Sequence, residues 1–226
     1  MRIKQPREAM LDALDFDGKR VADIGCGDGS VARIMAERGA SVTGIDVSEN
    51  AIAKARTPEP VGNETFVLAS ADDMPFEDES QDIVIFLNST HHMTADKQIT
   101  AIDEAIRVLV PDGLLFFSEP LAEGQRYELN KPFADEANLR ACAQQAIHDV
   151  PAKGFAVEKE FEFTVERRFE DFDSFRANVI KDDERRRKFD ANEAKLRELF
   201  ATLGDRRADA TYFDQPMRVN LFRKRS

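Results

Sequence analysis

The chain has 226 residues, with no tryptophan, only two cysteines and only three histidines. Cys26 and Cys142 are far apart in the sequence, which does not suggest a disulfide framework and is typical of a protein from a reducing compartment. His148 is remote from the pair His91 and His92, so no ligand spacing for zinc appears. We therefore expect no metal site.

Two other absences limit the partners. No apolar run approaches the length needed to span a membrane, and the first residues lack the apolar core of a signal peptide, so we expect a cytoplasmic protein without membrane contact. Lys and Arg number 32 against 43 Asp and Glu, which gives a net charge of -11. Because phosphate backbones are bound by clustered cations, we expect no nucleic-acid partner. The sequence leaves the oligomeric state open.

Three glycines at alternate positions follow the point where an apolar strand ends. Residues 21–24 form the strand, Gly25, Gly27 and Gly29 come next, and residues 30–35 continue with helical spacing. A strand-to-helix turn of glycines lets a ligand approach the backbone, because no Cβ is in the way, and it permits φ values open mainly to glycine. The segment therefore predicts a site for a nucleotide-like ligand.

The turn differs from the dinucleotide pattern G-x-G-x-x-G, since its third position is Ser30 and the extra glycine is Gly29. Asp23 precedes the turn, and its carboxylate would repel a pyrophosphate but attract an ammonium group. The next strand, residues 41–46, ends in Asp46 about 20 residues beyond the first glycine, where a carboxylate can bind both ribose hydroxyls. The pattern D-x-G-x-G-x-G with this second acid resembles motif I of the class I S-adenosylmethionine-dependent methyltransferases.

The loop from Ser70 to Phe76 carries the same resemblance. It is similar to the G-D-A-E-x-L-P-F loop of small-molecule methyltransferases, although Ala69 and Ser70 replace the Gly-Asp. This leaves Ser70 or Asp72 to accept from the adenine amino group, and a charged surface loop is the alternative. The resemblance implies S-adenosyl-L-methionine as the cofactor, bound by Asp23, Gly25, Cys26, Gly27, Asp46, Val47, Ala71, Asp72, Met74 and Asn88.

Strands and helices alternate over the first 120 residues. Strands are expected at residues 21–24, 41–46, 64–69, 82–87 and 114–120. The alternation predicts an α/β fold with a doubly wound, mostly parallel, seven-stranded sheet of the Rossmann-like kind. In the helix that Thr94 caps, Ile99, Ile102, Ile106 and Leu109 are expected to form one buried stripe.

Beyond Pro120 the resemblance is architectural only. We expect a loop at 121–132, a helix up to Val150, a strand at 155–165, two helices separated by a charge run at 182–188, and a last strand with a bulge at Pro216. We interpret residues 1–226 as a single methyltransferase domain. In it, the segments 121–150 and 171–204 are helical insertions that form a cap over the acceptor pocket.

His91 and His92 follow the strand at 82–87, at the sheet edge where open α/β sheets place their ligands. An imidazole titrates near neutral pH, which suits a general base. In similar lipid-modifying methyltransferases the first residue of the corresponding acid-His pair faces the acceptor. The resemblance therefore gives the catalytic role to His91 and leaves His92 to packing. The alternative is that both histidines only stabilise the loop.

Methyl transfer from a sulfonium is an in-line displacement, so alignment and desolvation can supply most of the catalysis. We expect an enzyme that transfers a methyl group from S-adenosylmethionine to a small-molecule acceptor. A methyltransferase acting on RNA or protein is an alternative, which a basic stripe around the pocket mouth would favour. A cofactor-binding protein without catalysis is another, which a pocket closed to acceptors would favour.

Overall fold

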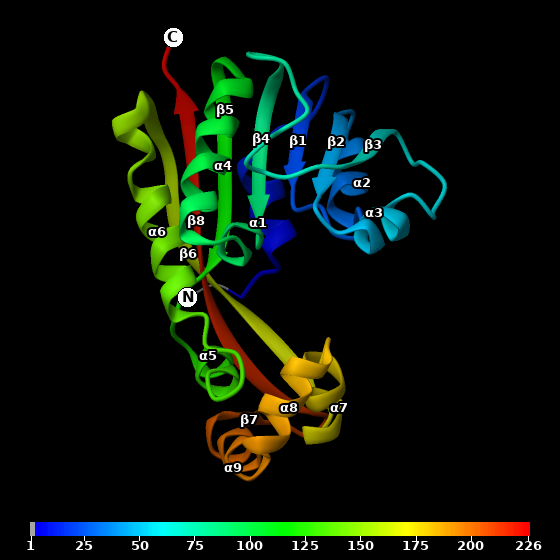
Figure 1. Cartoon of the computed structure of the whole chain (residues 1–226), viewed down its shortest axis with the longest axis vertical. Helices are drawn as coiled ribbons and strands as arrows, with labels where there is room; N and C mark the ends of the chain where they lie inside the picture. Colours follow the sequence, from blue (N-terminus) through cyan, green and yellow to red (C-terminus); the bar gives the residue numbers. More distant parts are fainter. Residues whose placement is uncertain (1–2) are drawn as a thin grey trace.

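The computed structural model describes residues 3–226. The first two residues of the N-terminal stretch, in which no signal peptide was expected, lie outside the described residues. Figure 1 shows a twisted sheet with helices on both faces and a smaller helical part at one end of the long strands β6 and β8.

The sheet has eight strands, seven of them in the order β3-β2-β1-β4-β5-β8-β6, while β7 pairs with β8. The strands are β1 (Arg20–Ile24), β2 (Ser41–Asp46), β3 (Asn63–Leu68), β4 (Gln81–Leu87), β5 (Leu109–Pro120), β6 (Phe155–Phe169), β7 (Asp205–Arg206) and β8 (Thr211–Lys224). The five strands from β3 to β5 in this order are parallel, and β8 runs antiparallel to both of its neighbours, β5 and β6. This confirms the predicted Rossmann-like, mostly parallel sheet.

Helices cover both faces of this sheet, as expected for a doubly wound fold. The helices are α1 (Pro6–Ala13), α2 (Ser30–Ala36), α3 (Glu49–Ala55), α4 (Ala95–Val108), α5 (Gln125–Asn130), α6 (Ala137–His148), α7 (Phe172–Val179), α8 (Asp183–Ala191) and α9 (Glu193–Leu203), with 3-10 turns η1 (Thr90–His92) and η2 (Val150–Lys153). Met10 of α1 and Met35 of α2 belong to the core on one face. Ile102 of α4 and Ile147 of α6 belong to the core on the other.

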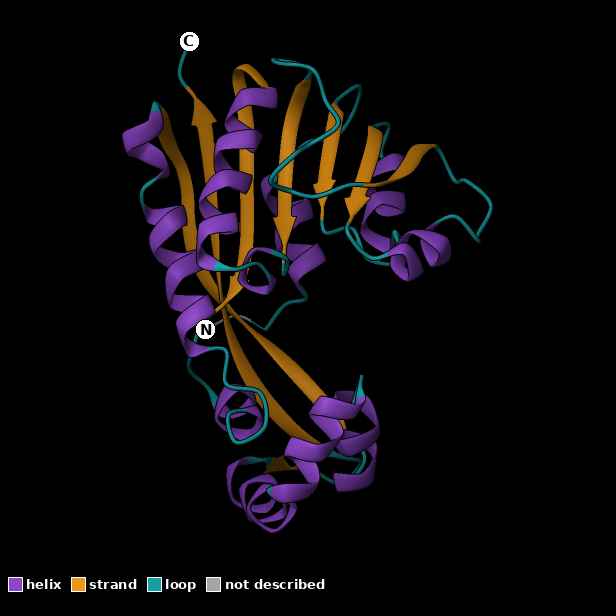
Figure 2. Ribbon diagram, viewed as in Figure 1, coloured by secondary structure: helices purple, strands orange, loops and turns teal. Residues whose placement is uncertain are grey.

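A third apolar core lies at the C-terminal end of β6 and the N-terminal end of β8. Figure 2 shows the helices gathered at this end of the two strands, apart from those that cover the sheet. We call the part of the chain around this core, residues 121–136 and 171–210, the cap. The buried side chains of this third core are mostly phenylalanines: Phe133, Phe169, Phe172, Phe175, Phe189, Phe200 and Phe213. The predicted insertion at 121–150 divides between the two parts, because α5 contacts α9 in the cap whereas α6 packs against α4 on the sheet.

Two expectations about helices are wrong. The predicted loop at 121–132 contains α5, whose six residues are too few to show an apolar period. The charge run at 182–188 does not separate two helices but lies in an additional helix, α8, between α7 and α9. Asp182 caps α8 by accepting from the Arg185 N–H, and Phe189 anchors it in the third core.

Two further expectations about α4 and β8 are also wrong. Ile99 is 51% exposed, so the buried face of α4 is instead formed around Ile102, Ala101 and Ala105. Pro216 causes no bulge, since its pairing with β6 is regular. The Pro216 carbonyl accepts from the Leu121 N–H, just beyond the point where β5 stops pairing with β8. The nitrogen of Pro216 is on the same side of β8 as this carbonyl, so no strand there requires the N–H that proline lacks.

Candidate functional site

The carboxyl ends of β1, β2 and β4 open into a cavity of about 390 Å³. Six of the residues predicted to bind the cofactor line it: Gly25, Asp46, Val47, Ala71, Asp72 and Asn88. The topology explains this, because β1 is flanked by β2 and β4 and all three strands run in the same direction. The loops that follow them therefore converge at one edge of the sheet.

The glycine turn after β1 forms one wall of the cavity. Gly25 has φ +75°, and a Cβ at this position would lie 2.6 Å from the Cβ of Ser89, so the close approach of the two loops requires glycine. Gly27 has φ +57°, but a Cβ there would meet no atom within 4 Å. Its N–H donates to Asp46 Oδ2 over 3.0 Å, which links the turn to the end of β2.

Two acids lie close together behind this turn. The Asp46 carboxylate also accepts from the Ser48 N–H over 2.8 Å, so both of its oxygens are held in place. Asp23 is 2% exposed, and its Oδ2 has no hydrogen-bond partner among residues 3–226. Burial, together with the charge of Asp46, raises the pKa of Asp23 from 3.8 to about 7.

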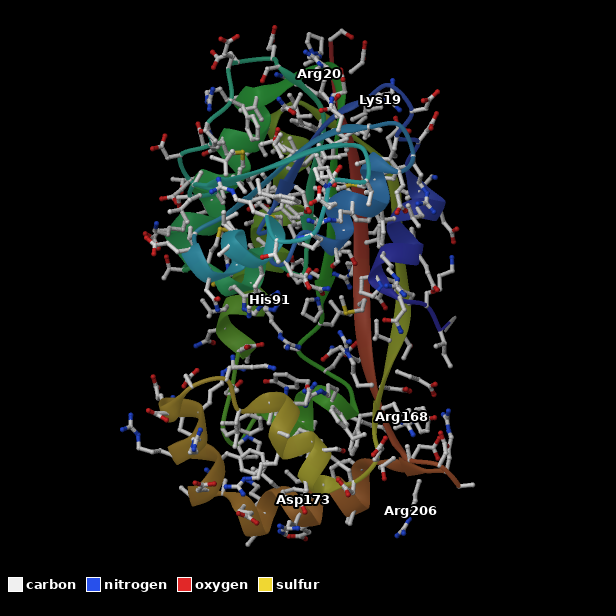
Figure 3. The ribbon with its side chains drawn as sticks, turned by 90° about the vertical axis from the view of Figure 1, so that its right-hand side faces the viewer. Lys19, Arg20, His91, Arg168, Asp173 and Arg206 are labelled. Atoms are coloured by element: carbon white, nitrogen blue, oxygen red, sulfur yellow. The ribbon has the colours of Figure 1, made fainter. Side chains whose placement is uncertain are left out.

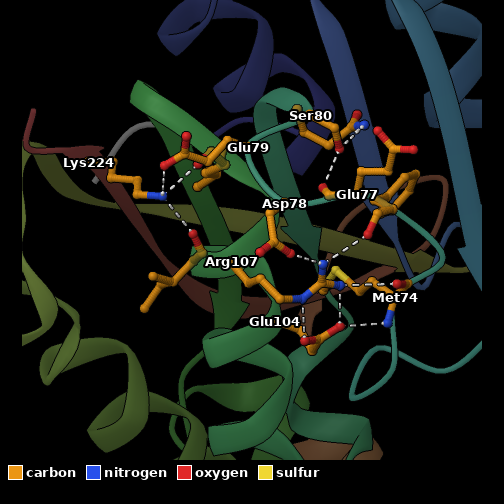
Figure 4. A network of polar contacts seen from close by, with 12 residues as sticks. Met74, Glu77, Asp78, Glu79, Ser80, Glu104, Arg107 and Lys224 are labelled. Carbon is orange, nitrogen blue, oxygen red and sulfur yellow. Dashed lines mark hydrogen bonds and ion pairs between the residues drawn. The ribbon is translucent and has the colours of Figure 1, made fainter.

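Four of the predicted cofactor residues do not line the cavity: Asp23, Cys26, Gly27 and Met74. The Cys26 thiol is buried, and burial followed by the charges of Asp23 and Asp46 raises its pKa to about 12, so it stays protonated. The Met74 N–H donates to Glu104, and its carbonyl accepts from Arg107. Figure 4 shows how this network ties the loop to α4. Met74 therefore fixes the loop that carries Ala71 and Asp72.

Asp72 is held on the cavity wall by two neighbours. Its carboxylate accepts a short hydrogen bond from the Ser70 hydroxyl, and Lys97 Nζ lies 3.0 Å from its Oδ2. The hydroxyl of Ser70, followed by the Lys97 side chain, lowers the pKa of Asp72. Ser70 lines the cavity as well, so both candidates for the adenine amino group lie at the cavity wall.

A sharp turn follows β4 and carries the histidines. Asn88 has φ +58°, a left-handed conformation that asparagine tolerates better than most residues. The next residues form η1, in which the rings of His91 and His92 are 4.1 Å apart. His92 lines the cavity, whereas His91 is only 5% exposed. This cavity is lined by the predicted cofactor residues, so the assignment of His91 to the acceptor side and of His92 to packing stays a prediction.

His91 is oriented by Glu119, a buried residue at the end of β5 that is 1% exposed. One oxygen of Glu119 accepts from the N–H groups of Ser89 and Thr90 over 3.0 and 2.9 Å. The other lies 2.5 Å from His91 Nδ1. Figure 3 shows His91 at the end of the sheet that is nearer to the cap. Sequence reasoning gave Glu119 no role, since its contact with η1 depends on β5 lying beside β4.

Comparisons with known proteins agree with this geometry. A family model described as a methyltransferase domain matches residues 22–117. The fatty-acid O-methyltransferase of Mycolicibacterium smegmatis is 32% identical over 143 residues, which are 62% of this chain and 51% of the relative. A ubiquinone biosynthesis O-methyltransferase of Pseudomonas fluorescens is 33% identical over 113 residues, 47% of each chain. These matches support a class I S-adenosylmethionine-dependent methyltransferase family for the segment 22–117.

The likeness of the fold extends further than the sequence match. The crystal structure of the YcgJ protein from Bacillus subtilis aligns with 98% of both chains at a TM-score of 0.70, with 18% sequence identity. In contrast, the chain spans about half the length of the curated relatives that it matches. The family's cofactor is S-adenosylmethionine, so the site can be tested for its fit to that molecule.

The residues present fit this cofactor. Asp23 offers a buried carboxylate oxygen without a partner, which suits an ammonium group. The Asp46 carboxylate is fixed by two N–H donors at the cavity wall, which suits ribose hydroxyls. Val47 is 71% exposed although it is apolar, and it lines the cavity, where an adenine ring would cover it. The individual binding roles remain predictions.

We expect Asp46→Ala to weaken S-adenosylhomocysteine binding by about 1.5 to 3 kcal/mol, the usual loss for hydrogen bonds to a charged group. Calorimetric titration measures this loss. The Ala variant also removes the acceptor of the Gly27 N–H, so Asp46→Asn, which keeps one oxygen, separates the two effects. Glu49→Gln, an exposed acid at the start of α3, is the charge control. Unchanged affinity in both Asp46 variants would show that the ribose is held elsewhere.

None of the described helices is both long enough and apolar enough to cross a membrane. Within residues 3–226 no group of three or more His, Cys, Asp or Glu side chains is arranged to hold a metal ion. The expectations about metal, membrane and nucleic acid remain predictions.

Proposed function

We propose that the protein transfers a methyl group from S-adenosylmethionine to a small-molecule acceptor, with His91 as the general base. The observation that carries this proposal is the position of the oriented Glu119 and His91 pair beside the cavity that Asp46 and His92 line. The names of the O-methyltransferase relatives support an acceptor of this class.

When bound, S-adenosylmethionine supplies a methyl group on a positively charged sulfur. Asp23, the glycine turn and Asp46 would hold it at the carboxyl ends of β1 and β2. Glu119 accepts from His91 Nδ1–H, which leaves Nε2 as the nitrogen that can take a proton from an acceptor oxygen or nitrogen. His92 cannot be oriented in this way by Glu119, because that carboxylate already bonds to His91 and the η1 backbone.

A small acceptor also agrees with the arrangement of the cap. The cap lies beyond the end of the sheet at which the cavity opens, and β6 and β8 connect the two parts (Figures 1 and 3). We propose that it covers the acceptor and excludes water, which strengthens the electrostatic interactions at the reacting atoms. The net charge of -11 is unfavourable for a polyanionic substrate such as RNA.

A screen of metabolite pools for release of S-adenosylhomocysteine tests the proposal. With the acceptor found, we expect His91→Asn to lower kcat by about 10²- to 10⁴-fold, the usual contribution of a general base. The matched variant His92→Asn should lower it far less. Equal losses in both variants would remove the base role from His91. Turnover of RNA or protein, and of no small molecule, would overturn the acceptor class.

A further inference from the structure

Four arginines and one carboxylate gather where the cap meets the sheet. Arg126 comes from α5, Arg140 from α6, Arg167 from β6 and Arg185 from α8, and the carboxylate is Glu136 at the start of α6. The feature is unusual in a chain with 43 acidic residues, because within residues 3–226 Glu136 is the one acid that forms ion pairs with these four arginines.

Glu136 is shared by two of these arginines. Arg140 donates to its Oε2 over 2.9 Å, and the Arg185 guanidinium lies 3.7 Å from its Oε1. Arg140 is 7% exposed, and its remaining contacts are to neutral oxygens, the Leu121 carbonyl and the Gln215 side chain.

The other two arginines have no acid of their own. Within residues 3–226, neither Arg126 nor Arg167 has a carboxylate within 4.0 Å. Arg126 donates to the neutral amide oxygen of Asn130, and its guanidinium lies 5.2 and 5.3 Å from the ring centres of Phe169 and Phe175. Ring stacking of this kind orients a guanidinium but does not neutralise it.

Burial makes the unbalanced charge costly. It lowers the pKa of Arg126 to about 10, and the charges of the other three arginines act in the same direction. Arg167, in contrast, is exposed, so a dissolved anion can reach its guanidinium. A folded protein does not gain stability from a poorly solvated, unpaired cation such as Arg126, so a functional reason for the group is expected.

The direction in which Arg167 points links the group to the site. In β6 it lies opposite Phe213 and two residues before Phe169, so it is on the face of the strand that carries the cap core. Arg168, the next residue of the strand, is on the opposite face and pairs with Asp209. The pKa of Glu136 is lowered overall. Burial acts to raise it, but the hydrogen bond and charge of Arg140, followed by the charges of His91 and His92, lower it by more. Glu136 therefore lies within electrostatic range of the histidine loop.

We infer that this arginine group binds an anionic group, a carboxylate or a phosphate, on the methyl acceptor. Planar guanidinium groups match both anions with paired hydrogen bonds. Arg140 and Arg185 meet at Glu136, Arg126 lies over the Phe169 ring, and Arg167 is on the face of β6 that carries Phe169. The anion serves as an anchor, and a separate oxygen or nitrogen of the acceptor receives the methyl group beside His91. This inference rests on the proposed function, since it specifies the acceptor of the same site.

Thermal unfolding of the full chain, saturated with S-adenosylhomocysteine, tests the anion site directly. Inorganic phosphate replaces chloride at constant ionic strength, and acetate is used in a parallel series. We expect phosphate or acetate to raise the Tm of the wild type as its concentration increases. Arg167→Gln should weaken the binding of these anions about tenfold or more. The matched variant Arg168→Gln should leave the anion response unchanged.

The two series distinguish the sources of the anion. A response to phosphate alone indicates a phosphorylated acceptor, and a comparable response to acetate indicates a carboxylic acid. The inference is overturned if neither anion raises the Tm of the wild type, or if Arg167→Gln responds as the wild type does. Turnover of neutral acceptors only would also overturn it while leaving the proposed function intact. Failure to turn over any small molecule would instead contradict the proposed function.

Discussion

The substitution Asp23→Asn is expected to make the cofactor-free protein more stable at pH 8 and to weaken its binding of S-adenosylmethionine. The Asp23 carboxyl group is buried, its Oδ2 has no partner among the described residues, and its pKa is raised from 3.8 to about 7, by burial first and then by the charge of Asp46. A neutral amide of the same shape removes the cost of ionising this group inside the fold.

The dependence on pH has a definite sign. Between about pH 4 and pH 7 the folded state keeps a proton on Asp23 that the unfolded state has lost, so the contribution of Asp23 to stability falls as the pH rises through this window. A gap of about three pKa units corresponds to roughly 4 kcal/mol between the two ends of the window, as an order of magnitude. Urea unfolding of wild type and variant at pH 4, 6 and 8 should show a difference that grows with pH and favours the variant.

Asp28, an acid of the same turn, provides the control. The Ser30 side chain, followed by its backbone N–H, lowers the pKa of Asp28, so its contribution to stability is lost only as the pH falls through its folded-state pKa, below about 4. The difference between wild type and Asp28→Asn should therefore be constant from pH 5 to pH 8. A constant difference for Asp23→Asn as well would contradict a raised pKa in the fold.

Cofactor binding should respond in the opposite direction. An ammonium group beside Asp23 would favour the carboxylate, so calorimetry at pH 7 should detect protons released when wild type binds S-adenosylhomocysteine. In Asp23→Asn this release should disappear and the affinity should fall about 10- to 100-fold. A variant that is more stable and also binds as well as the wild type would show that the ammonium is held by another group.

The first half of the fold could be predicted because its signals are local. The strand, the glycine turn and Asp46 are read from neighbouring residues. Of the six predicted residues that line the cavity, Asp46 ends β2 and the other five lie in the loops that follow β1, β2, β3 and β4. The parallel order of these strands then follows from their alternation with helices. Residue type and spacing are therefore sufficient for the cofactor side of the site.

The acceptor side could not be predicted in the same way, because its contacts join distant segments. Glu119 meets His91 only because β5 lies beside β4, and Arg126, Arg167 and Arg185 converge only through the packing of the cap. A charged segment such as α8, which buries Phe189 as its one core residue, has almost no apolar pattern. Tertiary packing determines its structure.

We expect Glu119→Gln to retain the fold but to abolish the base function of His91. The amide oxygen can still accept from the N–H groups of Ser89 and Thr90, but the amide nitrogen then faces His91 Nδ1 and donates to it. The imidazole proton must move to Nε2, the nitrogen that would take the acceptor's proton. Methyl transfer should fall about 10²- to 10⁴-fold, as for other bases held in the wrong tautomer. Nitrogen NMR of the histidine ring reports the tautomer even without an acceptor.

Glu119→Ala should have a different effect, because it leaves two buried N–H groups and the His91 ring without a partner. We expect it to lower the free energy of unfolding by about 3 to 5 kcal/mol, as measured by urea denaturation. Glu64 is the matched control, since it is also buried and accepts from two backbone N–H groups, those of Val61 and Gly62, away from the cavity. Glu64→Gln should therefore leave the His91 tautomer and methyl transfer unchanged. If Glu119→Gln also leaves both unchanged, Glu119 does not orient His91, and the pair supplies only stability to η1.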